Sequence, residues 1–148
     1  MEQSRDAESS RASKSHSHPI YETLQNLDIR LLVLAPGLHH DPLKAVLISV
    51  SCTHNTSGQA FKEKYVALSY TWGDQSNPAS LELNGSYTLP IGRNLAAALK
   101  HARLKDSFCV LWVDALCIDQ NDEVEKSRQV QRMPTIYEAA TMTLIWLG

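Results

Sequence analysis

One apolar run near the end of the chain limits the possible folds more than any other feature. CVLWVDALCIDQ (109–120) is apolar enough to form a buried strand, although Asp114 lies in its middle. Strands of this kind are typically covered on both faces, as in the centre of a parallel sheet. Amphipathic segments at 95–104 and 123–140 flank the run, and TLIWLG (143–148) has the pattern of another buried strand. This helix, strand, helix, strand order predicts an α/β fold with parallel strands.

The first half of the chain favours hairpins. Apolar, β-prone runs predict strands at 29–34, 44–50 and 65–70, and residues 51–63 are polar enough to form a loop. Within LELNGSYTL (81–89), Asn84-Gly85 has the composition of a tight hairpin turn. The sequence therefore predicts an α/β fold with a mixed sheet, a largely parallel core and N-terminal hairpins.

Local signals also mark the ends of the chain and the two helices. Residues 1–19 are Ser-rich and polar, so we expect a disordered tail followed by a domain over 20–148. Asn94 is placed to cap the first helix. Pro134 removes a backbone donor inside the second helix, so we expect a kink or a restart there.

Composition excludes several classes of function. The net charge of −2 favours neither nucleic acid nor anionic lipid as a partner, and no apolar run is long enough for a membrane span. The three cysteines show no C-x-x-C spacing, which indicates a reducing, cytoplasmic environment. No phosphate loop, dinucleotide-binding motif or nucleophile elbow is present, so kinase, NTPase, dehydrogenase and esterase functions have no support. His39 and His40 lack a second cluster of ligands, so we expect no metal site.

Several linked motifs resemble a known family. ALSYTWGD (67–74), LPIGRNLAAAL (89–99), LWVDALCIDQND (111–122) and IWLG (145–148) occur in the order and spacing of the fungal HET, or heterokaryon incompatibility, domain. The resemblance covers roughly residues 21–148. Because the domain of that family continues past the last of these motifs, the resemblance implies that this chain holds its N-terminal, truncated portion.

The resemblance implies a function in filamentous fungi. HET-domain proteins trigger programmed cell death when genetically different hyphae fuse, in response to non-self. The domain is also distantly similar to TIR domains, some of which cleave NAD while others assemble as scaffolds. Two hypotheses follow: a self-associating signalling module that engages other incompatibility proteins, or a TIR-like NAD-cleaving hydrolase. Neither implies a bound cofactor, since NAD would be a substrate.

Three carboxylates are candidates for catalysis. In the hydrolase hypothesis Glu125, which resembles the TIR glutamate in outline, would stabilise the positive charge that develops on the ribose of NAD. Asp114 or Asp119 would orient that ribose. Each has a structural alternative. Asp122 and Glu125 fit a capping box, and Asp119 can bond the backbone of its own turn. Asp114 can accept backbone N–H bonds, or pair with an arginine such as Arg93 or Arg128.

Five further residues are candidates for ligand binding. Trp72 could stack on a ring, and the others could supply polar contacts: Ser69, Asp74, Gln120 and Arg128. The alternatives are that Trp72 plugs the edge of the sheet, that Asp74 caps its turn, and that Arg128 lies on a solvated helix face.

Overall fold

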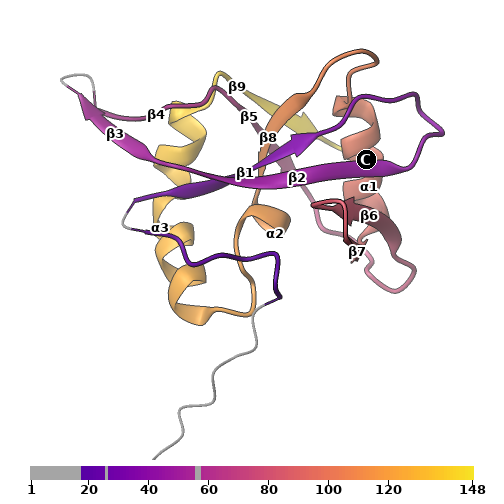
Figure 1. Cartoon of the computed structure of the whole chain (residues 1–148), viewed down its shortest axis with the longest axis horizontal. Helices are drawn as coiled ribbons and strands as arrows, with labels where there is room; N and C mark the ends of the chain where they lie inside the picture. The colour runs from indigo at the N-terminus through magenta and orange to yellow at the C-terminus, as the bar shows by residue number, and fades with distance from the viewer. Residues whose placement is uncertain (1–17, 26, 56–57) are drawn as a thin grey trace, which may run out of the picture.

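A seven-stranded mixed sheet forms the frame of the molecule (Figure 1). The structure is a computed structural model that describes residues 18–25, 27–55 and 58–148. Its strands lie in the order β7-β6-β2-β1-β8-β5-β9. Their bounds are β1 Ile29–Leu34, β2 Leu43–Val50, β5 Val66–Tyr70, β6 Ala79–Leu83, β7 Tyr87–Ile91, β8 Cys109–Val113 and β9 Met142–Trp146.

Strand pairing confirms the α/β fold with a mixed sheet. The β1–β2 and β6–β7 pairs are antiparallel hairpins, and β8, β5 and β9 run parallel to one another. The centre of the sheet is not wholly parallel, as the predicted largely parallel core would require, because β8 is antiparallel to its other neighbour, β1. The turn between β6 and β7 follows the prediction, since Asn84 and Gly85 have φ values of 54° and 71°.

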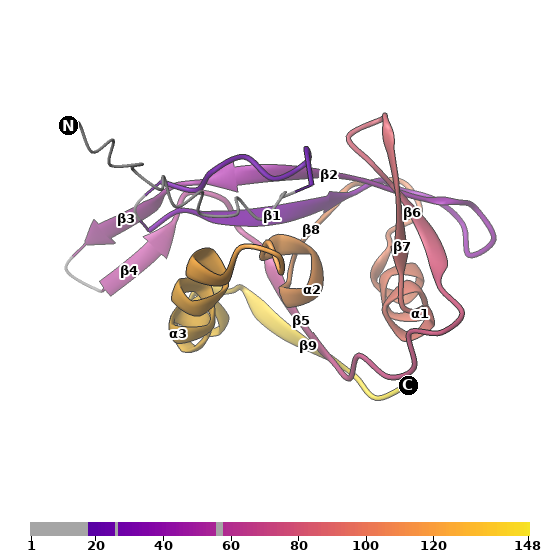
Figure 2. The same ribbon diagram turned by 90° about the horizontal axis from the view of Figure 1, so that it is seen from below.

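In the described residues, three helices accompany the sheet: α1 (Arg93–Ala102), α2 (Asp114–Cys117) and α3 (Glu123–Ala139). Figure 2 shows all three on the same side of the β1–β2 hairpin. They cover a core built on β1, in which Ile29, Leu31, Leu32 and Leu34 have no exposed surface. Within the described part of the chain, none of the helices has the length and apolar character required to traverse a bilayer.

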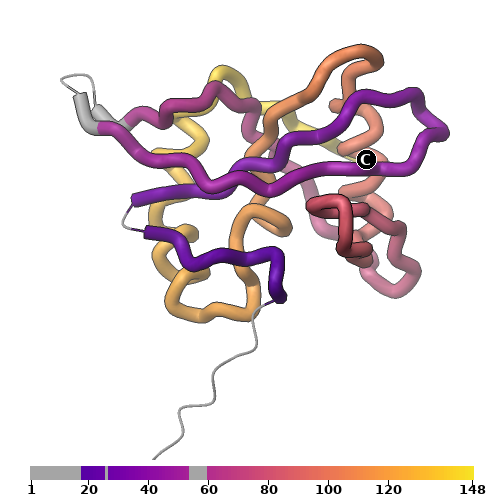
Figure 3. The backbone as a smooth tube through the Cα atoms, viewed as in Figure 1, coloured from indigo at the N-terminus to yellow at the C-terminus, as the bar shows by residue number. Residues whose placement is uncertain are grey.

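The segment that precedes β1 also shapes the molecule. Figure 3 traces this indigo segment past the N-terminal half of α3 before the chain enters the sheet. Gln129 of α3 donates a hydrogen bond to the carbonyl oxygen of Asp28 at 3.3 Å, which joins the two elements. Residues 1–17, most of the predicted disordered tail, lie outside the described residues.

Two predicted elements differ in the structure. The apolar run is a strand only as far as Val113, and Asp114 begins the short helix α2. An apolar run without clear periodicity does not distinguish a strand from a buried helical turn. The segment 51–63, predicted as a polar loop, instead contains a small antiparallel sheet of β3 (Cys52–Asn55) and β4 (Gly58–Phe61). Pairing the two strands gives their backbone N–H and C=O groups hydrogen-bond partners, although the segment is largely polar.

The helices also correct two local predictions. The N-cap of α1 is Gly92 rather than Asn94. Asn94 lies in the first turn, where its amide donates to the carbonyl of Thr71 and accepts from the Trp146 indole at 2.9 Å. Helix α3 continues through Pro134 without a restart. Buried Ile136 lies beyond the proline, so packing against the core holds the last turns in place.

Candidate functional site

Asp114 lies where the chain leaves β8 and enters α2. Its Oδ1 accepts a hydrogen bond from the backbone N–H of Ala115 at 2.7 Å, and its carboxylate is also bonded by the side chain of Trp72. Desolvation raises the pKa of Asp114, against the lowering effect of these two bonds. The alternative in which it accepts a backbone N–H bond is therefore confirmed, whereas the predicted pairing with Arg93 or Arg128 is wrong among the described residues.

Trp72 and Gln120 line a shallow cleft beside Asp114. The cleft has a volume of about 140 Å³ and lies beyond the carboxyl ends of β5 and β8, where open α/β sheets bind ligands. Gln120 donates from Nε2 to the carbonyl oxygen of Asp114 at 3.0 Å. Trp72 is 42% exposed, so it does not plug the sheet. The structure thus brings Asp114, Trp72 and Gln120 together.

Ser69 and Asp74 point to other partners. The Ser69 side chain bonds Tyr137 of α3. The Asp74 carboxylate accepts from the backbone N–H and the hydroxyl of Ser76, both at 2.8 Å, as its turn-capping alternative predicted. These two bonds lower the pKa of Asp74. Neither residue lines the cleft beside Asp114.

Glu125 belongs to a second group of residues, at the start of α3. Asp122 is the N-cap and accepts from the backbone N–H groups of Val124 and Glu125 at 3.1 and 3.0 Å. Glu125 does not complete the capping box, because its carboxylate does not bond the Asp122 amide. It accepts from the Asp119 N–H at 3.0 Å and forms an ion pair with Arg30, whose Nη2 lies 3.0 Å from Oε2.

Arg30, which lies beside Glu125, was not predicted from the sequence as a residue of this group. It is 2% exposed, it donates to the carbonyl oxygens of Glu22 and Cys117, and its guanidinium lies over the Tyr21 ring. A signal was present, because Arg30 is the charged residue in the otherwise apolar strand IRLLVL. A buried arginine requires a carboxylate or several carbonyl oxygens, and this one has both.

Asp119, Asp122 and Glu125 converge near this ion pair. Their oxygens lie within 4.8 Å of one another, a spacing that could hold a metal ion. Each carboxylate already serves the protein: Asp119 accepts from the Asn121 N–H, Asp122 caps α3, and Glu125 neutralises Arg30. A cation here would compete with the Arg30 guanidinium, so the cluster is better explained as structural.

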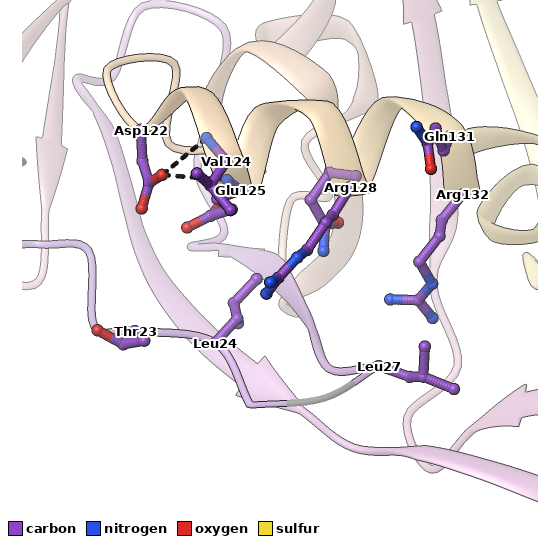
Figure 4. Close-up of a pocket in the computed structure, with 10 residues that line it drawn as sticks. Thr23, Leu24, Leu27, Asp122, Val124, Glu125, Arg128, Gln131 and Arg132 are labelled. Atoms are coloured by element: carbon purple, nitrogen blue, oxygen red, sulfur yellow. Dashed lines mark hydrogen bonds between the residues drawn. The ribbon is translucent and has the colours of Figure 1, made fainter.

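Glu125 also borders a larger cavity of about 360 Å³ between α3 and the segment before β1 (Figure 4). Arg128 lines this cavity, whereas Trp72 and Gln120 line the other cleft. The two sets of lining residues have no member in common. Of the predicted site residues, Trp72 and Gln120 therefore line one cavity and Glu125 and Arg128 line the other. The structure does not place Glu125 and Trp72 in a single cleft.

Cys117 does not add a nucleophile to either group. Cys117 is fully buried in α2, and burial raises the pKa of its thiol to about 12. A thiol with this pKa is protonated at neutral pH and is a poor nucleophile.

Comparisons with known proteins point to one family. The family model described as heterokaryon incompatibility protein (HET) matches residues 65–148, more than half of the chain. Heterokaryon incompatibility protein 6, OR allele, of Neurospora crassa is 34% identical over 96 residues, which cover 57% of this chain. This chain spans only 14% of that protein's length. No solved structure matches.

Proposed function

Because the chain belongs to the heterokaryon incompatibility (HET) family, we propose that it is an effector of non-self-recognition cell death in filamentous fungi. It acts in the cytoplasm as a self-associating signalling module that engages other incompatibility proteins. The observation that carries this proposal is the match of the heterokaryon incompatibility protein (HET) family model to residues 65–148, the segment that holds β5 to β9.

Self-association is supported by the two edges of the sheet. Strand β7 contains Pro90, which lacks an N–H donor and disfavours pairing with a further strand. Strand β9, MTLIW, has no proline and no charge. Met142 and Ile145 of β9 are 56% and 65% exposed. An uncharged apolar edge of this kind is suited to pairing with a further strand, which the proposal assigns to another copy.

The ion pair between Arg30 and Glu125 favours assembly over NAD cleavage. A TIR-like glutamate needs a free carboxylate oxygen for the developing ribose cation. Arg30 bonds both carboxylate oxygens of Glu125, and the Asp119 N–H also bonds one of them. The hydrolase proposal would additionally require Trp72 beside Glu125, and these residues line separate cavities.

A matched pair of substitutions tests the role of β9. Ile145→Lys places a charge on the open edge, whereas Phe108→Lys places the same charge on a residue of similar exposure, 63%, just before β8. We expect the parent chain and Phe108→Lys to form oligomers in light scattering and to kill cells when expressed in a filamentous fungus. Ile145→Lys should be monomeric and harmless. Killing by a monomeric Ile145→Lys protein would refute the assembly proposal.

A further inference from the structure

The cavity between α3 and the segment before β1 has the features of an anion site. Arg128 and Arg132 are one turn apart on α3, so their side chains emerge on the same face. Figure 4 shows both projecting from the helix toward the segment that carries Leu24 and Leu27. The volume of about 360 Å³ lies within the usual range for small-molecule sites.

Within the described part of the chain, neither arginine has a carboxylate partner. Among the residues that the structure describes, Arg128 forms no ion pair or hydrogen bond. Arg132 has a single long bond, 3.5 Å from Nη1 to the carbonyl oxygen of Asp28, and its Nη2 is buried without an acceptor. Glu125, which also lines the cavity, is neutralised by Arg30. Two neighbouring guanidiniums with unused donors are suited to an anion that accepts several hydrogen bonds, as a phosphate group does.

The opposite end of the cavity offers acceptors. Asp122, at the start of α3, lies about 15 Å from Arg132 along the helix axis, given ten residues at the usual helical rise. Gln129 lines the cavity between them, is 4% exposed, and has a buried Oε1 without a donor. A ligand that carries hydroxyl groups could donate to these oxygens.

We propose that this cavity binds a small phosphate monoester that carries hydroxyl groups, such as a sugar phosphate. The phosphate lies between Arg128 and Arg132, and the hydroxyl groups face Gln129 and Asp122. Leu24 and Leu27 cover the carbon skeleton from the segment before β1. The site is separate from the β9 edge, so its occupancy can be tested independently of assembly.

Calorimetric titration of the whole chain with ribose 5-phosphate tests this proposal, with ribose and inorganic phosphate as comparison ligands. We expect ribose 5-phosphate to bind more tightly than inorganic phosphate, and ribose not to bind. Arg128→Gln should weaken binding at least fivefold and Arg132→Gln at least tenfold. Lys126→Gln removes the same charge from α3 outside the cavity, and should change binding less than twofold.

Three results would overturn the assignment. These are no binding of ribose 5-phosphate at millimolar concentration, equal binding of inorganic phosphate, and equal weakening by Lys126→Gln and Arg128→Gln. Because Arg132 also contacts the Phe61 ring, Arg132→Gln can perturb folding. Amide chemical-shift changes in the parent chain provide a second measurement. They should concentrate in α3 and in residues 23–25 and 27–28, and shifts confined to other regions would contradict the proposal.

Discussion

Arg30 of β1 and Glu125 of α3, ninety-five residues apart in sequence, form a bidentate ion pair that links the sheet to the start of the last helix. Their side chains are 2% and 11% exposed. Arg30 also binds the carbonyl oxygens of Glu22 and Cys117, so this one guanidinium joins the segment before β1, α2 and α3. The pair holds together the walls of the cavity that contains Arg128.

Removal of one partner should be costly. Arg30→Met leaves the Glu125 carboxylate buried without its cation, and should lower the free energy of unfolding by about 3 to 5 kcal/mol in urea denaturation. The double variant Arg30→Met/Glu125→Met should regain much of this loss, since no unpaired charge remains. Lys44→Met is the matched control: its pair with Glu82 spans 3.7 Å and is exposed, so it should cost at most about 1 kcal/mol. Equal losses for Arg30→Met and Lys44→Met would contradict a structural role for the buried pair.

The N-cap of α3 makes a separate contribution. Asp122→Ala removes the acceptor of two backbone N–H groups, so thermal or urea unfolding should show a loss of about 1 kcal/mol. Asp106→Ala, an exposed residue in the loop before β8, should leave stability within about 0.5 kcal/mol of the parent. An Asp122→Ala protein as stable as the Asp106→Ala protein would show that water replaces the cap.

Asp114 should make stability depend on pH. Because the pKa of Asp114 is raised in the folded state, the folded chain binds a proton at this carboxyl more tightly than the unfolded chain does. The contribution of Asp114 to stability is therefore most favourable at low pH. It is lost as the pH rises from 3.8, the ordinary pKa of this carboxyl, through the higher pKa of the folded state. Asp114→Asn keeps an oxygen for Trp72 and Ala115 but cannot ionise. The stability of this variant relative to the parent should be higher at pH 7 than at pH 4 in urea denaturation, and the opposite order would refute the assignment.

Asn94 links two elements: it bonds Thr71, in the loop that follows β5, and Trp146, in β9. Asn94→Ala should lower the free energy of unfolding by about 2 kcal/mol, at about 1 kcal/mol for each hydrogen bond. Trp146 should become more exposed, with its fluorescence shifted to longer wavelength. Asn77→Ala, in the exposed part of the same loop, serves as the control, and an equal response from both variants would indicate that Asn94 has no special role.

Some features with a local cause were predictable from the sequence. Asn84-Gly85 predicted the β6–β7 hairpin because two successive positive φ angles favour these residues. Asp122 predicted the start of α3, since an N-cap bonds only the next turn. The alternation of apolar strands and amphipathic helices likewise indicated the α/β class.

Features that depend on distant partners were not predictable. Apolar character alone does not show that the chain turns into α2 at Asp114. The pairing of Arg30 with Glu125 depends on how β1 and α3 pack, which neither local segment encodes. For the same reason the sequence does not reveal that Glu125 and Trp72 line separate cavities.

The most direct measurement for the proposed function is a time course of cellular NAD and viability after this chain is induced in a filamentous fungus. The assembly proposal predicts that viability falls while the NAD content of surviving cells stays constant. A fall in NAD that precedes the loss of viability would contradict it and favour hydrolysis. Full survival of the induced cells would contradict the effector function itself.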